Sequence, residues 1–169
     1  MSASIKLGLV GLGVIGQAIL NAADEGRIPV SVPVVTTSSP VKVESFLRSL
    51  NAPPRLTDLT GVAEGADMVM EASGGTTVES ICRAAFALGK DVIINSAGAL
   101  LEGDHLIELA RQSGTRIFVP SGAIIGLDGL KGAAMGRVDA VTMTTRKPPA
   151  SLKGAPYLEE KGVNVDNFM

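Results

Sequence analysis

Three glycines near the amino terminus have the spacing of a dinucleotide-binding turn. Gly11, Gly13 and Gly16 form a G-x-G-x-x-G pattern that follows an apolar run and opens a segment with helical periodicity. In such a turn the first glycine permits a tight bend, the second lets the backbone approach a pyrophosphate, and the third allows close helix packing. The unpaired N–H groups at the helix start favour an anion. The pattern predicts binding of NAD or NADP, and the alternative is a glycine-rich turn without a ligand.

The next informative segment follows the second expected strand. Enzymes that prefer NAD ordinarily carry Asp or Glu here, and its carboxylate accepts hydrogen bonds from the adenosine ribose. This chain instead has Thr36, Thr37 and Ser38, followed by Lys42, so no carboxylate repels a 2′-phosphate and several polar hydrogens could bind one. The segment therefore permits NADP as well as NAD. The alternative is that Thr37 and Ser38 only cap the following helix.

Three further loops of small residues follow expected strands, at residues 73–75 (SGG), 95–99 (NSAGA) and 121–124 (SGAI). In an open parallel sheet the ligand lies beyond the carboxyl ends of the strands. Each loop alone is merely a turn, but three at equivalent strand ends favour one shared site for a nicotinamide ring and its ribose. The predicted cofactor contacts are Gly11, Gly13, Val14, Ile15, Gly16, Thr36, Thr37, Ser38, Ser73, Gly74, Ser96, Ala97, Gly98 and Ala123.

The single histidine and the single cysteine are not predicted to be catalytic. His105 begins an expected helix, where the helix dipole disfavours imidazolium, so a surface position is expected. Cys82 lies among apolar residues of another expected helix and is predicted to be a small buried hydrophobe. One cysteine makes neither an internal disulfide nor a cysteine-rich metal site. No metal site is predicted.

A pair of basic residues in the carboxyl-terminal part is a weak candidate for substrate binding. Arg146 and Lys147 precede two prolines that fix the backbone, and arginine suits bidentate recognition of a carboxylate. Ser121 and Gly122, in the third small-residue loop, are added to them as weak candidates. The alternative is a solvated charged loop.

Short apolar runs alternate with helical patterns along the chain. Apolar strands of this kind predict a parallel sheet covered on both faces, a Rossmann-type doubly wound α/β domain. Pro29 and Pro33 predict that the early part of the second strand lies at an edge or is irregular. The predicted strands are residues 5–10, 30–35, 67–72, 91–94 and 116–119, and the predicted helices are residues 14–24, 42–50, 76–88 and 104–112.

The alternation changes at residues 120–122 (PSG), which suggests a domain boundary. Residues 1–120 are predicted to form the dinucleotide-binding domain. Residues 121–169 are predicted to be the incomplete start of an α+β substrate or dimerisation domain. Within it we expect a helix at residues 126–135 and a strand at residues 139–145, followed by a polar, proline-rich stretch.

Composition excludes several classes of function. The 169 residues carry a net charge of −2 and only 3% aromatic residues, which argues against nucleic acid and against anionic membranes as partners. The apolar run at residues 7–20 is interrupted by glycines and is shorter than the ~20 residues of a membrane span. A single cysteine fits a reducing compartment, so we expect a cytoplasmic protein.

Four segments make the chain resemble the L-aspartate dehydrogenase family, together with the glycine turn: residues 95–100 (NSAGAL), 119–128 (VPSGAIIGLD), 144–149 (TTRKPP) and 152–157 (LKGAPY). The resemblance implies NAD(P)-dependent oxidative deamination of L-aspartate to oxaloacetate and ammonia through iminoaspartate, which can feed NAD biosynthesis. It also implies a homodimer or larger assembly and places a cofactor contact at Ala123.

Members of this family continue beyond the length of this chain, and their catalytic histidine and a cofactor-contacting asparagine lie in that further part. No catalytic residue is therefore carried over onto these 169 residues, and the chain alone is expected to be inactive. Two alternatives stay open. One is a non-catalytic NAD(P)-binding module, and the other is a related NAD(P)-dependent oxidoreductase that acts on another amino acid or an imine.

Overall fold

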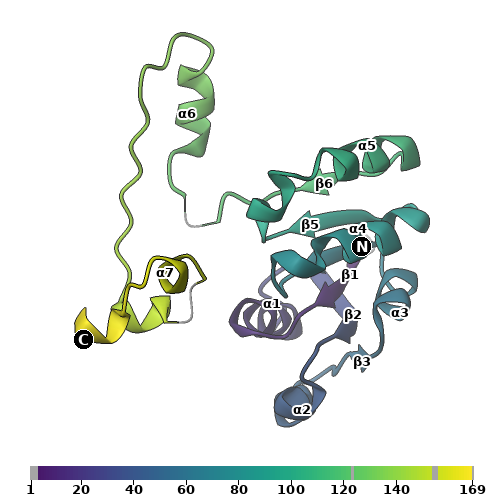
Figure 1. The fold of residues 1–169 in the computed structure, drawn as a ribbon. Coiled ribbons are helices and arrows are strands. Elements are labelled where there is room, and N and C mark those ends of the chain that lie inside the picture. Colours follow the sequence, from purple (N-terminus) through teal and green to yellow (C-terminus); the bar gives the residue numbers. More distant parts are fainter. Residues whose placement is uncertain (1–3, 123, 154–155, 169) are drawn as a thin grey trace. The chain divides into compact units, whose positions relative to one another are not determined.

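The computed structural model of the chain describes residues 4–122, 124–153 and 156–168. They form two compact units that divide between Ile124 and Ile125 and are described separately. The first unit contains a parallel sheet with its helices (Figure 1). Its elements are β1 (Ile5–Val10), α1 (Val14–Asp24), β2 (Val30–Thr36), α2 (Pro40–Arg48), β3 (Arg55–Leu56), α3 (Leu59–Glu64), β4 (Met68–Glu71), η1 (Gly75–Thr77), α4 (Val78–Ala87), β5 (Asp91–Ile94), η2 (Ala97–Leu100), α5 (Asp104–Ser113) and β6 (Ile117–Phe118).

The six strands lie in the order β3-β2-β1-β4-β5-β6, and every neighbouring pair is parallel. This order, which reverses direction beside β1, is that of the doubly wound dinucleotide-binding fold. The predicted fold class is confirmed. β1, α1 and β5 have the predicted bounds, and α5 is capped at its carboxyl end by Gly114, whose φ of +68° is a left-handed conformation that suits glycine.

Two apolar clusters cover the two faces of the sheet. On one face, Leu7 and Leu9 of β1 pack with Leu20 of α1 and Val43 of α2. The other face is covered by buried side chains of α3, α4 and α5. Gly8 belongs to this second face, since a Cβ at Gly8 would lie 2.7 Å from a methyl carbon of Val62 in α3. The close approach of α3 to β1 therefore depends on the missing side chain.

An irregularity in β2 lies at its internal proline. Lys6 of β1 pairs with Ser31, but Gly8 pairs with Val34, so β2 has one extra residue between these pairs. Such a bulge reverses the side-chain alternation, and Val32 and Val35 accordingly belong to the same cluster although they are three residues apart. The irregularity predicted from Pro33 is confirmed.

Two elements between β2 and β4 were not predicted. β3 has two residues and pairs only with Val34 and Val35. α3 has six residues, and the Asp58 carboxylate caps it by accepting a hydrogen bond of 2.8 Å from the Gly61 amide. α2 also begins two residues before the predicted helix, with Pro40 in its first turn, where its missing N–H costs nothing.

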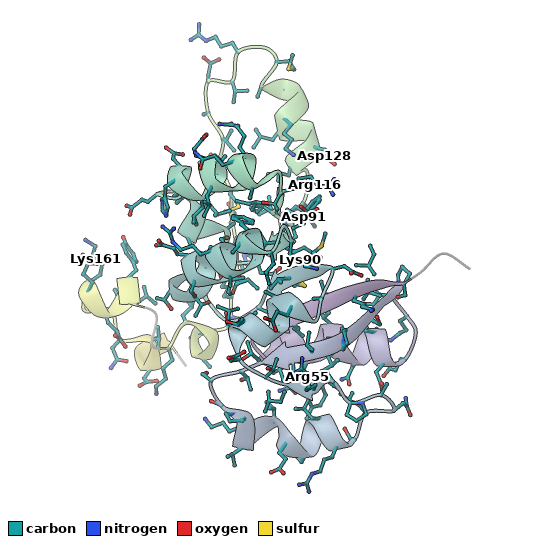
Figure 2. The ribbon with its side chains drawn as sticks, turned by 90° about the vertical axis from the view of Figure 1, so that its right-hand side faces the viewer. Arg55, Lys90, Asp91, Arg116, Asp128 and Lys161 are labelled. Atoms are coloured by element: carbon teal, nitrogen blue, oxygen red, sulfur yellow. The ribbon has the colours of Figure 1, made fainter. Side chains whose placement is uncertain are left out.

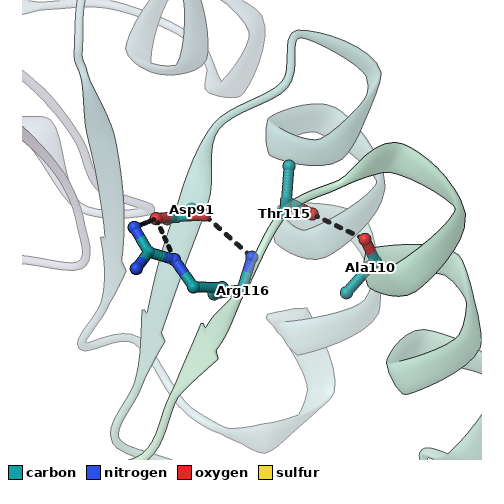
Figure 3. A network of polar contacts seen from close by, with 4 residues as sticks. All are labelled: Asp91, Ala110, Thr115 and Arg116. Carbon is teal, nitrogen blue, oxygen red and sulfur yellow. Dashed lines mark hydrogen bonds and ion pairs between the residues drawn. The ribbon is translucent and has the colours of Figure 1, made fainter.

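One carboxylate adds to the backbone pairing between the edge strand β6 and β5. Figure 2 labels Asp91, the first residue of β5, and Arg116, which directly precedes β6, and Figure 3 shows their contacts. Asp91 accepts a bond of 2.8 Å from the Arg116 amide and bonds of 3.0 and 2.7 Å from its guanidinium. Thr115 donates to the carbonyl of Ala110 at 3.3 Å, which ties the start of β6 to α5.

We expect Asp91→Ala to lower the free energy of unfolding by about 1–2 kcal/mol, because a backbone donor of the edge strand loses its charged acceptor. Arg116→Ala should cost less than about 1 kcal/mol, since its side chain is 73% exposed whereas that of Asp91 is 17% exposed. Urea denaturation of both variants checks this. Equal losses would show that the ion pair, and not the backbone bond, holds the strand.

The second unit consists of short helices joined by irregular chain. It contains α6 (Leu127–Ala133), η3 (Pro149–Leu152), α7 (Pro156–Glu160) and η4 (Val165–Phe168). The Lys153 ammonium lies 3.1 Å from the Asp166 carboxylate and ties η3 to η4. The strand predicted at residues 139–145 is wrong: that segment is irregular, and the described part of this unit contains no strand with which it could pair. The functional division into residues 1–120 and 121–169 stays a prediction.

Candidate nucleotide-binding site

A cleft of about 630 Å³ opens where β1, β2 and β4 end. Its walls come from the glycine turn with the start of α1, from the end of β2 with the first turn of α2, and from the loop after β4. This size lies within the range of small-molecule and cofactor sites. The lining residues are Val10, Gly11, Leu12, Gly13, Gln17, Thr36, Thr37, Ser38, Ser39, Lys42, Val43, Ala72, Ser73 and Thr77.

Each glycine of the turn meets a different steric requirement. Gly11 has a φ of +97°, and a Cβ there would lie 2.5 Å from the carbonyl oxygen of Ala72. A Cβ at Gly16 would lie 2.1 Å from the carbonyl oxygen of Gly11, so α1 touches its own preceding turn. A Cβ at Gly13 would meet no atom within 4 Å. Gly13 is therefore the glycine that leaves space for something outside the fold.

The start of α1 offers unpaired donors beside this open space. The first bond of the helix runs from the Gln17 amide to the Gly13 carbonyl at 2.9 Å, so the amides of Val14, Ile15 and Gly16 precede the helical bonding pattern. The first turn of α1 contains no acidic residue. These donors and the helix dipole suit a diphosphate. The residues present thus fit a dinucleotide.

A buried carboxylate that the sequence interpretation missed connects two of the predicted loops. Glu71, the last residue of β4, has no exposed surface. It accepts hydrogen bonds from the backbone amides of Ser73 and Gly74, both at 2.7 Å, and from that of Ser96 at 2.8 Å. The Asn95 side chain donates to the Glu71 carbonyl at 2.6 Å. One residue therefore sets the positions of the loops after β4 and β5.

These hydrogen bonds also determine the charge of Glu71. Burial by itself raises the pKa of this carboxyl group, but the bonds from Gly74, Ser96 and Ser73 outweigh burial, and the pKa lies below its ordinary value of 4.5. Glu71 is therefore ionised at neutral pH. Burial, together with the smaller effect of this charge, raises the pKa of the Cys82 thiol to about 11. Cys82 is accordingly a protonated, buried residue and not a nucleophile.

The predicted cofactor contacts fall into groups around the cleft. Gly11, Gly13, Thr36, Thr37, Ser38 and Ser73 line it. Gly74 and Ser96 are held by Glu71, and Ala97 and Gly98 follow in η2. Ser121 and Gly122 follow β6 and are exposed, while Ala123 lies outside the described residues. Arg146 and Lys147 lie exposed in the second unit, so their contact with substrate stays a prediction.

The described residues place no histidine at the cleft, and they form no metal site and no membrane-spanning helix. The side chain of His105 is half exposed, and its Nε2 lies 3.7 Å from the Glu79 carboxylate. Neither residue lines the cleft. Among the described residues, no cluster of three or more histidine, cysteine or carboxylate side chains could hold a metal ion. None of their helices has the length and apolarity needed to cross a bilayer.

Two protein families match successive parts of the sequence. The family described as homoserine dehydrogenase, NAD binding domain, matches residues 11–120. The family described as aspartate dehydrogenase, C-terminal, matches residues 128–169. The first match covers the glycine turn and the strands that form the cleft.

The chain is also similar to L-aspartate dehydrogenases along almost its whole length. It is 36% identical to that of Bradyrhizobium diazoefficiens over 167 residues, which are 99% of this chain and 59% of the relative. It is 36% identical to that of Methanocella arvoryzae over 96% of this chain and 62% of the relative. The chain thus spans about three fifths of the length of these curated relatives.

Solved structures show the same fold. Myo-inositol dehydrogenase from Lactobacillus casei, in complex with NAD(H) and myo-inositol, has a TM-score of 0.65 at 19% identity and matches 79% of this chain and 42% of its own. Biliverdin reductase from Synechocystis, in complex with biliverdin and NADP+, has a TM-score of 0.60 at 22% identity and matches 69% and 38%. The chain is thus similar to L-aspartate dehydrogenases along almost its whole length, and with its glycine turn and its NAD- or NADP-binding fold it belongs to the family described as homoserine dehydrogenase, NAD binding domain.

Proposed function

We propose that the chain is part of an L-aspartate dehydrogenase. This enzyme carries out the NAD(P)-dependent oxidation of L-aspartate to iminoaspartate, which water converts to oxaloacetate and ammonia. The observation that supports this most is a glycine turn with open space at Gly13, in a chain 36% identical to L-aspartate dehydrogenases. A homodimer or larger assembly and a cytoplasmic location belong to the same proposal.

The contribution of this chain to the reaction is to bind and orient. When bound, NAD or NADP accepts the hydride that leaves the α-carbon of L-aspartate. The amides at the start of α1 bind the diphosphate, and Glu71 fixes the loops of Ser73 and Ser96, beside which we expect the nicotinamide ring. Holding two reacting carbons in near-contact can supply ~7–11 kcal/mol of barrier reduction. We propose that Arg146 and Lys147 bind the carboxylates of the substrate.

Proton transfer needs an acid or base beside the substrate, and no histidine is among the described residues that line the cleft. The one histidine of the sequence, His105, lies beside Glu79 and outside the cleft lining. We therefore propose that none of these 169 residues is the catalytic acid or base. The chain alone should bind the dinucleotide without turning over L-aspartate.

Two measurements test this function. Calorimetric titration of the purified chain should show binding of NAD or NADP, and the same chain should form no reduced nicotinamide with L-aspartate. The full product of the gene that encodes this chain should reduce the dinucleotide with L-aspartate. A gene product that reduces it only with another amino acid contradicts the substrate, and one that binds without any turnover supports the non-catalytic module instead.

A further inference from the structure

One end of the cleft has a chemistry that the proposed function does not require. At the end of β2 and the start of α2, its wall consists of Thr36, Thr37, Ser38, Ser39 and Lys42. These residues contribute four hydroxyl groups and one cation. No aspartate or glutamate is among the described residues that line the cleft.

This end of the cleft is fixed relative to the glycine turn. The Gly11 amide donates to the Thr36 carbonyl at 2.8 Å, so the hydroxyl-rich segment begins next to the turn that suits the diphosphate. In this fold the adenosine ribose lies at that position, and the residue at the end of β2 contacts its 2′ substituent. The segment therefore faces the one atom at which NAD and NADP differ.

Helix capping does not account for these side chains. The residue that caps α2 is Ser39, and its side chain makes no capping hydrogen bond. Thr37 accepts a bond of 3.3 Å from the Ser39 amide, which leaves its own hydroxyl hydrogen free to donate. The exposed hydroxyl of Ser38 is not a cap either, because Ser38 precedes the capping residue.

The cation of this wall, the Lys42 ammonium, has no ion-pair partner among the residues that the structure describes. The nearest acid along α2, Glu44, pairs with Arg48 instead. Lys42 therefore places a positive charge at the cleft that no described carboxylate offsets and that would attract an anion.

We propose that Ser38 and Lys42 form a subsite for the 2′-phosphate of NADP, and that the chain binds NADP in preference to NAD. This inference rests on the proposed function, since it concerns the cofactor of that site. A phosphate monoester carries about −1.5 to −2 charges at pH 7, which match the lysine and the hydroxyl donors. For NAD, the described lining of the cleft provides no carboxylate to accept the hydrogen bond of the ribose hydroxyl.

The experiment compares dissociation constants of NADP and NAD for the purified chain by calorimetry at low ionic strength. We expect NADP to bind about tenfold or more tightly, since one charge-assisted hydrogen bond accounts for a factor of this size. Lys42→Gln should raise the dissociation constant of NADP about tenfold and change that of NAD by less than about twofold. Added salt should narrow the preference because it screens the exposed lysine.

Two controls separate the subsite from general charge and from misfolding. Lys90→Gln removes the same charge just before β5, at the end of the strand away from the cleft, and should change neither constant. Ser38→Asp should reverse the preference toward NAD, whereas Ser38→Asn should not. Thermal unfolding of each variant verifies its fold.

The outcomes separate the subsite from the function it serves. The subsite is overturned if the unaltered chain binds NAD as tightly as NADP, or if Lys42→Gln weakens the binding of both dinucleotides equally. Either result leaves the dehydrogenase proposal intact. Failure of both dinucleotides to bind a folded chain contradicts the proposed function itself.

Discussion

We expect Glu71→Gln to lower the free energy of unfolding of the first unit by about 3 kcal/mol. The amide that replaces one carboxylate oxygen would point N–H groups at the amides of Ser73, Gly74 or Ser96, which now donate to that oxygen. Because Glu71 is fully buried, water cannot take the place of the lost acceptor. Chemical denaturation followed by circular dichroism measures the loss.

A matched control is available in the helix that follows. Glu79 of α4 has an exposed side chain that pairs with Arg83, and Glu79→Gln should leave the free energy of unfolding nearly unchanged. A comparable loss in both variants would contradict the role assigned to Glu71. The dinucleotide affinity of Glu71→Gln should also fall, since the loops after β4 and β5 lose their common acceptor.

The same carboxylate predicts a dependence of stability on pH. The pKa of Glu71 is lower in the folded chain than its ordinary value of 4.5, so its contribution is complete above that pH and is lost as the pH falls through the folded value. Below pH 4.5 the unaltered chain should therefore lose stability more steeply than Glu71→Gln. Parallel slopes for the two proteins on the acid side would argue that other groups carry the dependence.

The second large effect concerns binding and not folding. Gly13→Ala should weaken dinucleotide binding roughly 100-fold. The added methyl group would occupy the open space beside the amides of α1, and the diphosphate would lose about two charge-assisted hydrogen bonds. The backbone of Gly13, with φ of −77° and ψ of −160°, accepts any residue. Stability should therefore change by less than about 1 kcal/mol. Calorimetric titration and thermal unfolding of the same variant measure both quantities.

Gly16→Ala provides the contrasting variant. Its Cβ would lie 2.1 Å from the Gly11 carbonyl oxygen, a backbone atom that cannot rotate away, so unfolding should become easier by about 2–3 kcal/mol. The two glycines thus separate affinity from stability within one turn. Full affinity in Gly13→Ala would show that the open space does not hold the dinucleotide.

The part of the fold that the sequence predicts well is the part in which local signals agree with the sheet. The bounds of β1, α1 and β5 agree with the prediction because the apolar runs there end at glycine or at polar residues. α3 was missed because six residues with an internal glycine carry almost no periodicity, although the capping residue Asp58 was a usable signal. The strand at residues 139–145 was wrong because apolar character alone supplies no partner strand.

The candidate site divides in the same way. The glycine turn is a local pattern, and its geometry is the one that the pattern requires. The sequence does not identify Glu71 as a connecting residue, since one of its donors, the Ser96 amide, lies 25 residues further along the chain. The available signal was a lone acidic residue that ends an apolar strand immediately before small residues.

The thiol of Cys82, whose pKa the Glu71 carboxylate helps to raise, can be used to report on opening of the folded structure. Cys82 is fully buried, so an alkylating reagent can reach it only during transient openings of the surrounding structure. The slow rate of labelling would then measure how often the native state opens. A dinucleotide that binds only the closed state should slow that labelling by a factor of one plus the ratio of its free concentration to its Kd, so the labelling rate of Cys82 would report on dinucleotide binding.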